Sequence, residues 1–205
     1  MLKDAHLREN TCIIILAAGA STRLGFPKQM VSFNGRTLLQ HTVEAALSSD
    51  IGPVVVVLGA FADEIGVTLE SYDELHIVTN NSFSEGLSSS IKSGLRTALL
   101  TIENLEGVVL MLCDQPCIDS SILTDLIGTH VKTGLPIVSC DYGEKHGPPT
   151  YINKTFFKEL LILKGDLGAK SLLSKYHTQV AWTPFLNGDK DVDFPEDLDS
   201  LPSFI

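Results

Sequence analysis

A glycine-rich stretch near the start of the chain carries the groups needed to hold a polyanion. Residues 16–29 read LAAGASTRLGFPKQ and follow directly on the apolar run CIIIL. The glycines leave backbone N–H groups unobstructed, and the hydroxyls of Ser21 and Thr22 add hydrogen-bonding groups. Arg23 can fork two phosphate oxygens, whereas Lys28 supplies a point charge. The spacing is not that of a Walker loop, since five residues separate the two glycines, but the composition predicts a phosphate-binding loop.

A carboxylate follows another apolar run further along the chain. Residues 108–116 read VVLMLCDQP, which puts Asp114 two residues past the run VVLML. If both runs are strands of one parallel sheet, their carboxyl ends share an edge, and Asp114 lies near the phosphates held by the loop. Carboxylate oxygens are suitable ligands for Mg²⁺. Asp114 is therefore predicted to bind a metal ion.

Short apolar runs and amphipathic segments predict the elements that position these groups. The runs are too short for helices and too uniformly apolar for half-exposed strands, so we expect buried parallel strands. Their alternation with helical patterns predicts an α/β fold, a three-layer α/β/α sandwich with a mostly parallel, Rossmann-like sheet and right-handed crossovers. The predicted strands cover 12–16, 54–58, 75–79, 108–112 and 136–140, and the predicted helices 38–47, 87–99, 122–131, 154–163 and 167–176. Thr37 with Gln40 predicts a capping box for the first helix, and Asp119-Ser120 supplies cap residues for the third.

Composition limits the other possibilities. The 205 residues contain no repeat or linker, so a single domain over 1–205 is expected. A formal charge of −10 argues against nucleic-acid and anionic-membrane partners, which require excess cationic charge. The apolar runs are far shorter than the roughly 20 residues of a membrane helix, which predicts a soluble, cytoplasmic protein. The four cysteines form no CxxC pair, and Cys12, Cys113 and Cys140 fall in strand-like runs, as buried thiols do.

The phosphate-binding loop carries a family resemblance. Residues 16–28 fit the pattern LAAGxSxRxGxxK, which resembles the nucleotide-binding motif of the nucleotidyltransferases that build sugar nucleotides and activated cofactors. It is similar to the molybdenum cofactor cytidylyltransferase branch, in an NTP transferase family that also includes the guanylyltransferases, whose loops tend to read LAGG. The resemblance implies a nucleotide-diphospho-sugar transferase type of fold. It assigns nucleotide binding to Leu16, Ala17, Ala18, Gly19, Ser21, Arg23 and Lys28.

Further motifs extend the resemblance to the nucleotide and the metal. Residues 80–95, NNSFSEGLSSSIKSGL, resemble a GxSSSxxxG element, which implies that Gly86, Ser88 and Ser89 contact base and ribose. Capping of the following helix is the structural alternative for these serines. The DQP sequence at Asp114 resembles the metal-binding motif of the family. The sequence DVDFPEDL near the end of the chain resembles the stretch that supplies a second metal ligand, here Asp193.

The acceptor side is implied by two looser matches. Gly147 and Pro149 fit a GxP element that precedes a strand and a helix, although Thr150-Tyr151 replaces the usual apolar pair. The segment GDLGAK resembles a GDxGAK element, in which Asp166 is either an acceptor ligand or a helix cap and Lys170 meets the acceptor phosphate.

The resemblance implies transfer of CMP from CTP to molybdopterin, with Mg²⁺ as cofactor and release of pyrophosphate. Arg23, Lys28 and Asp114 are then the catalytic residues, because phosphoryl transfer depends on positioning and charge neutralisation. The implied partners are CTP or another NTP, a phosphorylated pterin acceptor, and transiently a molybdenum insertase or recipient molybdoenzyme. Alternatives are a methylerythritol-phosphate cytidylyltransferase, disfavoured by CDQP where that family carries HDAARP, another sugar-phosphate nucleotidyltransferase, and a nucleotide-binding regulator. The acceptor, CTP against GTP, and the oligomeric state stay open.

Overall fold

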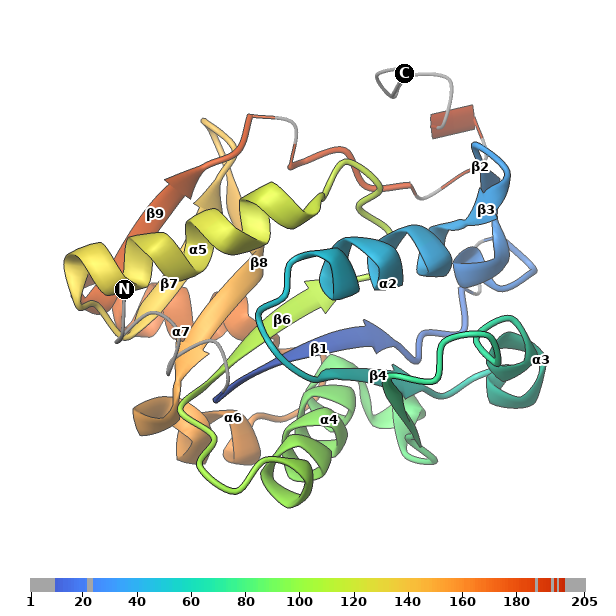
Figure 1. Cartoon of the computed structure of the whole chain (residues 1–205), viewed down its shortest axis with the longest axis horizontal. Helices are drawn as coiled ribbons and strands as arrows, with labels where there is room; N and C mark the ends of the chain where they lie inside the picture. Colours follow the sequence, from blue (N-terminus) through green and yellow to red (C-terminus); the bar gives the residue numbers. More distant parts are fainter. Residues whose placement is uncertain (1–9, 22–23, 187, 193, 195, 198–205) are drawn as a thin grey trace.

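A single seven-stranded sheet forms the centre of the computed structural model, which describes residues 10–21, 24–186, 188–192, 194, 196 and 197 (Figure 1). The strand order is β5-β4-β1-β6-β8-β7-β9, and a separate two-stranded hairpin pairs β2 with β3. The strands are β1 (Thr11–Ala17), β2 (Ser32–Phe33), β3 (Arg36–Thr37), β4 (Val54–Leu58), β5 (Leu75–Thr79), β6 (Gly107–Leu112), β7 (Ile137–Asp141), β8 (His146–Asn153) and β9 (Val180–Pro184). The helices are α2 (Leu38–Ser48), α3 (Ala62–Val67), α4 (Leu87–Thr101), α5 (Ser120–Thr133), α6 (Phe157–Ile162) and α7 (Ala169–Lys175).

Helices cover both faces of the sheet, which confirms the three-layer α/β/α fold. Side chains alternate between faces along a strand, and β1 shows both sides of the core. Ile13 and Ile15 pack with α2, α3 and α5, whereas Cys12, Ile14 and Leu16 pack with α4, α6 and α7. Figure 1 shows α2 and α5 on one side of the sheet and α4 and α6 on the other. All five residues are buried, so the end of β1 is a rigid base for the loop that follows it.

The five predicted strands are present and run parallel to one another. One expectation about them is wrong, because β5 is not buried. It lies at the edge of the sheet, pairs only with β4 among the described strands, and leaves Ile77 45% exposed. The apolar residues of a five-residue run do not reveal whether a second neighbour covers the strand.

The seven-stranded sheet has two strands beyond the five predicted, and the hairpin β2-β3 was not predicted. β8 lies antiparallel between β6 and β7, and it contains the HGPPT sequence that was expected to precede a strand. β9 pairs parallel with β7 at the other edge. The antiparallel strand β8 changes the architecture near the site, because it brings residues 146–150 to the edge where β6 ends.

The five predicted helices are present, whereas the short α3 was not predicted. Thr37 and Gln40 form a capping box at α2, and Asp119 caps α5 through the backbone N–H groups of Ser121 and Ile122. The segment 154–163 begins as a 3₁₀ turn and continues as the short α6, while α7 starts two residues later than expected. No helix in the described part of the chain has the length and apolar character needed to cross a membrane.

Candidate functional site

The loop after β1 is held in shape by a buried glutamine. Gln29 is 2% exposed, and its Nε2 donates to the backbone oxygens of Ala17, at 2.7 Å, and Gly19, at 2.9 Å. The backbone N–H of Lys28 donates to Oγ of Ser21 at 3.0 Å. These bonds fold the far end of the loop back onto its start. Sequence reasoning gave Gln29 no role, although its place directly after Lys28 in the motif was a usable signal.

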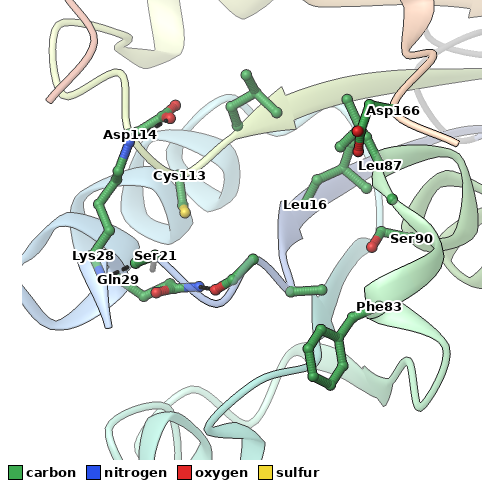
Figure 2. Close-up of a pocket in the computed structure, with 14 residues that line it drawn as sticks. Leu16, Ser21, Lys28, Gln29, Phe83, Leu87, Ser90, Cys113, Asp114 and Asp166 are labelled. Atoms are coloured by element: carbon green, nitrogen blue, oxygen red, sulfur yellow. Dashed lines mark hydrogen bonds and ion pairs between the residues drawn. The ribbon is translucent and has the colours of Figure 1, made fainter. Parts of the chain in front are cut away.

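A pocket of about 340 Å³ opens beside this loop at the carboxyl ends of β1 and β6 (Figure 2). Apart from its neighbours in the chain, no atom of the described residues lies within 4 Å of the position that a Cβ on Gly19 would take, so its backbone is open to the pocket. Figure 2 shows Lys28 and Asp114 on one side of this first pocket, with Ser90 and Asp166 opposite. The lining residues are Leu16, Ala18, Gly19, Ser21, Lys28, Gln29, Phe83, Gly86, Leu87, Ser90, Leu112, Cys113, Asp114 and Asp166.

Lys28 and Asp114 form an ion pair at the mouth of the first pocket. Lys28 Nζ lies 3.2 Å from Asp114 Oδ2, and their side chains are 15% and 22% exposed. Asp114 Oδ1 is buried and has no hydrogen-bond partner among the described residues. A buried carboxylate oxygen without a partner is costly. The geometry therefore suits a further cation or hydrogen-bond donor at Asp114.

The segment near the end of the chain lies against Asp114. The backbone N–H of Val192 donates to the backbone oxygen of Asp114 at 2.9 Å. Asp193, the predicted second metal ligand, and Arg23, the predicted phosphate ligand, lie outside the described residues. Among the residues that are described, no three acidic, histidine or cysteine side chains form a metal-binding group.

The three serines at the start of α4 have different surroundings. Ser90 lines the first pocket, whereas Ser88 and Ser89 are not among its lining residues. Ser89 Oγ donates to the backbone oxygen of Gly86 at 2.8 Å, and no side chain caps the start of α4. Asn80, 6% exposed, donates through Nδ2 to Oγ of both Ser89 and Ser90. The structure thus places Ser90, which the motif did not assign, at the pocket lining, where Asn80 orients it.

Gly86 is needed for the approach of the loop that carries Asp166. Its φ is 96°, and a Cβ there would lie 2.5 Å from the carbonyl carbon of Gly165 and 2.6 Å from Asp166 Oδ1. The backbone N–H of Ser88 donates to the oxygen of Gly165 at 3.0 Å. Asp166 does not cap α7, whose N-cap is Gly168. Gly86 therefore lets Asp166 reach the pocket wall.

A second pocket, of about 360 Å³, adjoins the first and shares Leu16, Leu87, Leu112 and Asp166 with it. Of the predicted acceptor residues, Gly147, Asp166 and Lys170 line this second pocket. Pro149 is buried and is not among its lining residues, while its neighbour Pro148 is. The lining is apolar along β6 and α4, and charged at the rim, where Lys145, His146, Lys170, Asp189 and Asp191 lie.

Gln115 and Tyr142 join the end of β6 to the far side of the second pocket, and sequence reasoning did not find them. Gln115 Nε2 donates to the backbone oxygen of Gly188 at 2.8 Å and to Tyr142 Oη at 3.3 Å. Tyr142 Oη in turn donates to the backbone oxygen of Pro148. Burial raises the pKa of the Tyr142 hydroxyl, so it stays protonated and remains a donor. Gln115 was visible in the DQP motif, but Tyr142 follows a strand with no motif around it.

The site combines a phosphate-binding loop, a cation and a carboxylate at the edge of an α/β sheet, with a second pocket alongside. A cation and a carboxylate placed together beside such a loop are the groups expected in a nucleotidyltransferase. Residues 13–180 match the MobA-like NTP transferase domain, and the chain belongs to this family.

Two curated relatives and one solved structure are similar over nearly the whole chain. Nicotine blue oxidoreductase from Paenarthrobacter nicotinovorans is 30% identical over 92% of this chain and 91% of its own. The purine catabolism protein PucB of Bacillus subtilis is 29% identical over 92% and 94%. A homologue of Mycobacterium tuberculosis Rv0371c from Mycobacterium sp. strain JC1 superposes with a TM-score of 0.81 at 33% identity, covering 93% of this chain and 94% of that one.

A divalent metal suits the site. A structure of Rv0371c from M. tuberculosis is a complex with manganese, and it superposes with a TM-score of 0.74 at 27% identity over 94% of this chain and all of that one. In the present chain, the buried and unpartnered Oδ1 of Asp114 supplies the hard oxygen that such an ion prefers.

Proposed function

We propose that this nucleotidyltransferase transfers CMP from CTP to molybdopterin and releases pyrophosphate, with Mg²⁺ as its metal. The observation that supports the reaction type is the position of Asp114. It stands beside Lys28 in the first pocket, with one unpartnered carboxylate oxygen, and a second pocket adjoins. The choice of CTP and of the pterin rests on the LAAG form of the loop, with Ala18 at the pocket lining. A single domain over residues 1–205 belongs to the same proposal.

In the proposed reaction, an oxygen of the acceptor phosphate forms a bond to the α-phosphorus of CTP. The bond from that phosphorus to the bridging oxygen of the β-phosphate breaks, and the electron pair leaves with pyrophosphate. The acceptor phosphate is already ionised, so no general base is required. Mg²⁺ supplies charge neutralisation at the α-phosphate when it is bound.

The side chains of this protein divide the remaining work. Lys28, together with Arg23, neutralises the charge that develops on pyrophosphate, and Asp114 with Asp193 holds the metal. The open backbone at Gly19 and the hydroxyl of Ser90 face the nucleotide in the first pocket. Ser90 accepts a hydrogen bond from Asn80, so its own proton is directed to another acceptor, which we assign to a base or ribose oxygen.

The second pocket is assigned to the acceptor. A flat heterocycle suits its apolar walls, and the cationic rim residues Lys145 and Lys170 suit an anionic phosphate. Gly147 and Asp166 line the same pocket, as the motif matches implied. Transient contact with an insertase or recipient molybdoenzyme would follow at its open mouth.

A matrix of substrates tests the proposal. Purified protein is incubated with CTP, GTP, UTP or ATP, each combined with molybdopterin or methylerythritol phosphate, and pyrophosphate release is measured with Mg²⁺ and with EDTA. The proposal expects release with CTP and molybdopterin, at least tenfold above every other pair, and none with EDTA. A preference for GTP or for methylerythritol phosphate would refute the substrate assignment. Tight CTP binding without release for any pair would favour a nucleotide-binding regulator.

A further inference from the structure

The chain segment 188–192, here named the strap, is tied to the sheet at both ends. The backbone oxygen of Gly188 accepts a hydrogen bond from Gln115 Nε2 at 2.8 Å. The N–H of Val192 donates to the backbone oxygen of Asp114 at 2.9 Å. Both ties therefore end on adjacent residues directly after β6. Between them, Asp189 and Asp191 line the second pocket, and neither lines the first.

The orientation of the Gln115 side chain is fixed by its partner. A backbone oxygen can only accept, so the amide nitrogen of Gln115 must face Gly188. Gln115 is 4% exposed, and the same nitrogen also donates to Tyr142 Oη. Loss of this amide would leave the buried oxygen of Gly188 without its side-chain donor.

Tyr142 packs against two glycines, Gly147 of β8 and Gly188 of the strap. A Cβ on Gly188 would lie 2.1 Å from Tyr142 Cε1, and one on Gly147 would lie 2.9 Å from its Oη. The ring therefore lies close to both backbones, and its hydroxyl bonds to Gln115 and to Pro148. One side chain thus connects the start of the strap, the segment after β6 and the first residues of β8.

We propose that Gln115 and Tyr142 are positioning residues that hold the strap as one wall of the second pocket, and that they thereby set the affinity for the acceptor but not for the nucleotide. The proposal rests on the proposed function, because the second pocket is taken there as the acceptor site. Lys145 Nζ lies 4.0 Å from Asp189 Oδ2. The position of the strap therefore also influences where the Lys145 ammonium lies relative to an acceptor phosphate.

Two substitutions separate this role from a general loss of stability. Tyr142→Phe keeps the ring between the glycines and removes the hydroxyl, and Gln115→Met keeps the volume and removes the donor. Tyr72→Phe is the matched control, because it also removes a tyrosine hydroxyl. That hydroxyl donates to Glu44 Oε1 at 2.9 Å, and neither residue lines either pocket. We expect both test variants to raise KM for molybdopterin about tenfold, with kcat and the CTP dissociation constant within twofold of the unmodified protein.

Hydrogen exchange and fluorescence provide readouts that do not require turnover. Peptides covering 188–192 are expected to exchange about fivefold or more faster in both variants, while peptides from β1 and α4 are unchanged. The chain has one tryptophan, Trp182, whose ring stacks on His146 at 4.0 Å between centroids. Since His146 lines the second pocket, the emission of Trp182 is expected to report molybdopterin binding directly. Titrations followed by this emission should show the same tenfold loss of molybdopterin affinity in both variants.

The outcomes distinguish the two proposals. If the unmodified protein fails to release pyrophosphate with molybdopterin while the strap still loosens in the variants, the proposed function is wrong and the positioning contact stands. If strap exchange is unchanged, or if CTP affinity falls as much as acceptor affinity, the positioning role is overturned. An equal loss of protection in β1 would also overturn it, because the residues would then act through global stability.

Discussion

Lys28 Nζ lies 3.2 Å from Oδ2 of Asp114, although 86 positions separate the two residues in the chain. The contact joins the loop after β1 to the end of β6, which are neighbouring parallel strands. The strand pairing places the ends of β1 and β6 side by side at one edge of the sheet. The loop after β1, held in shape by Gln29, then brings Lys28 to Asp114.

Removal of the Asp114 carboxylate should abolish most of the activity without unfolding the protein. We expect Asp114→Ala and Asp114→Asn to lower kcat for pyrophosphate release about a hundredfold or more, because each removes a group that acts mainly in the transition state. Asp125→Ala, at an exposed position of α5, is the charge-matched control. Thermal unfolding checks the fold, and activity of Asp114→Ala equal to that of the control would contradict the mechanism.

Lys28 should be as important as Asp114, for a different reason. Lys28→Ala and Lys28→Met remove a cation from the first pocket and leave the half-buried Asp114 carboxylate without this partner. We expect kcat to fall about a hundredfold. Lys132→Met, at an exposed position of α5, tests whether the loss reflects net charge alone. Single-turnover release of pyrophosphate is the measurement, and an unchanged rate for Lys28→Met would exclude a role in leaving-group stabilisation.

The serines of α4 should divide into one binding residue and one structural residue. Ser90→Ala is expected to weaken CTP binding about fivefold, since its hydroxyl lines the first pocket and accepts from Asn80, which leaves its proton to donate to the nucleotide. Ser89→Ala is expected to lower the free energy of unfolding by about 1 kcal/mol, since Ser89 bonds to Gly86 and Asn80. Nucleotide titration and chemical denaturation of both variants separate the effects. The reverse result would restore the assignment suggested by the motif.

A methyl group at Gly86 should be strongly destabilising. Its φ of 96° disfavours any other residue, and the added Cβ would meet the backbone of Gly165 at 2.5 Å. We expect Gly86→Ala to lower the free energy of unfolding by about 2 kcal/mol or more. Gly128→Ala is the matched control inside α5, where nothing lies within 4 Å, and it should stabilise by about 0.5–1 kcal/mol. Urea denaturation of the two variants checks the contrast in sign.

Stability should fall at alkaline pH because of buried thiols. Burial raises the pKa of Cys12 and of Cys140 from 9.0 to about 12. Each thiol therefore contributes stability that is fully present below pH 9 and is lost as the pH rises toward 12, at about 1.4 kcal/mol per pH unit. Thermal unfolding between pH 7.5 and 10.5 measures the loss. The double variant Cys12→Ala, Cys140→Ala should show a flatter profile, and an identical slope would rule out these thiols as the cause.

The sequence predicted those parts of the fold that depend on local pattern. The capping box of α2, the Asp119 cap of α5 and the five parallel strands follow from side-chain types at fixed spacing. The insertion of β8 between β6 and β7 depends on long-range pairing, and its HGPPT start carries two prolines that conceal a strand. The exposure of β5 likewise depends on its place at the edge of the sheet, which the residues of the strand do not reveal.

The candidate site was predictable to a similar degree. The motif supplied Lys28 and Asp114, and the sheet brings them together. The motif did not assign Ser90, which lines the first pocket, because its position depends on the face that α4 turns to the pocket and on the bond from Asn80. The nucleotide contacts of Ser88 and Ser89 stay a prediction. Tyr142 forms hydrogen bonds with Gln115, which is distant in the sequence, and with Pro148. Contacts of this kind have no local signature.

The wall shared by the two pockets, Leu16, Leu87, Leu112 and Asp166, has a consequence for what happens after the chemical step. Under the proposed function, the product joins the nucleotide and the acceptor and would occupy both pockets at once, so each half would raise the effective concentration of the other at its own binding site. Such a product would leave more slowly than either substrate, and its departure would then limit turnover. A receiving protein that draws out one half first would relieve this limit.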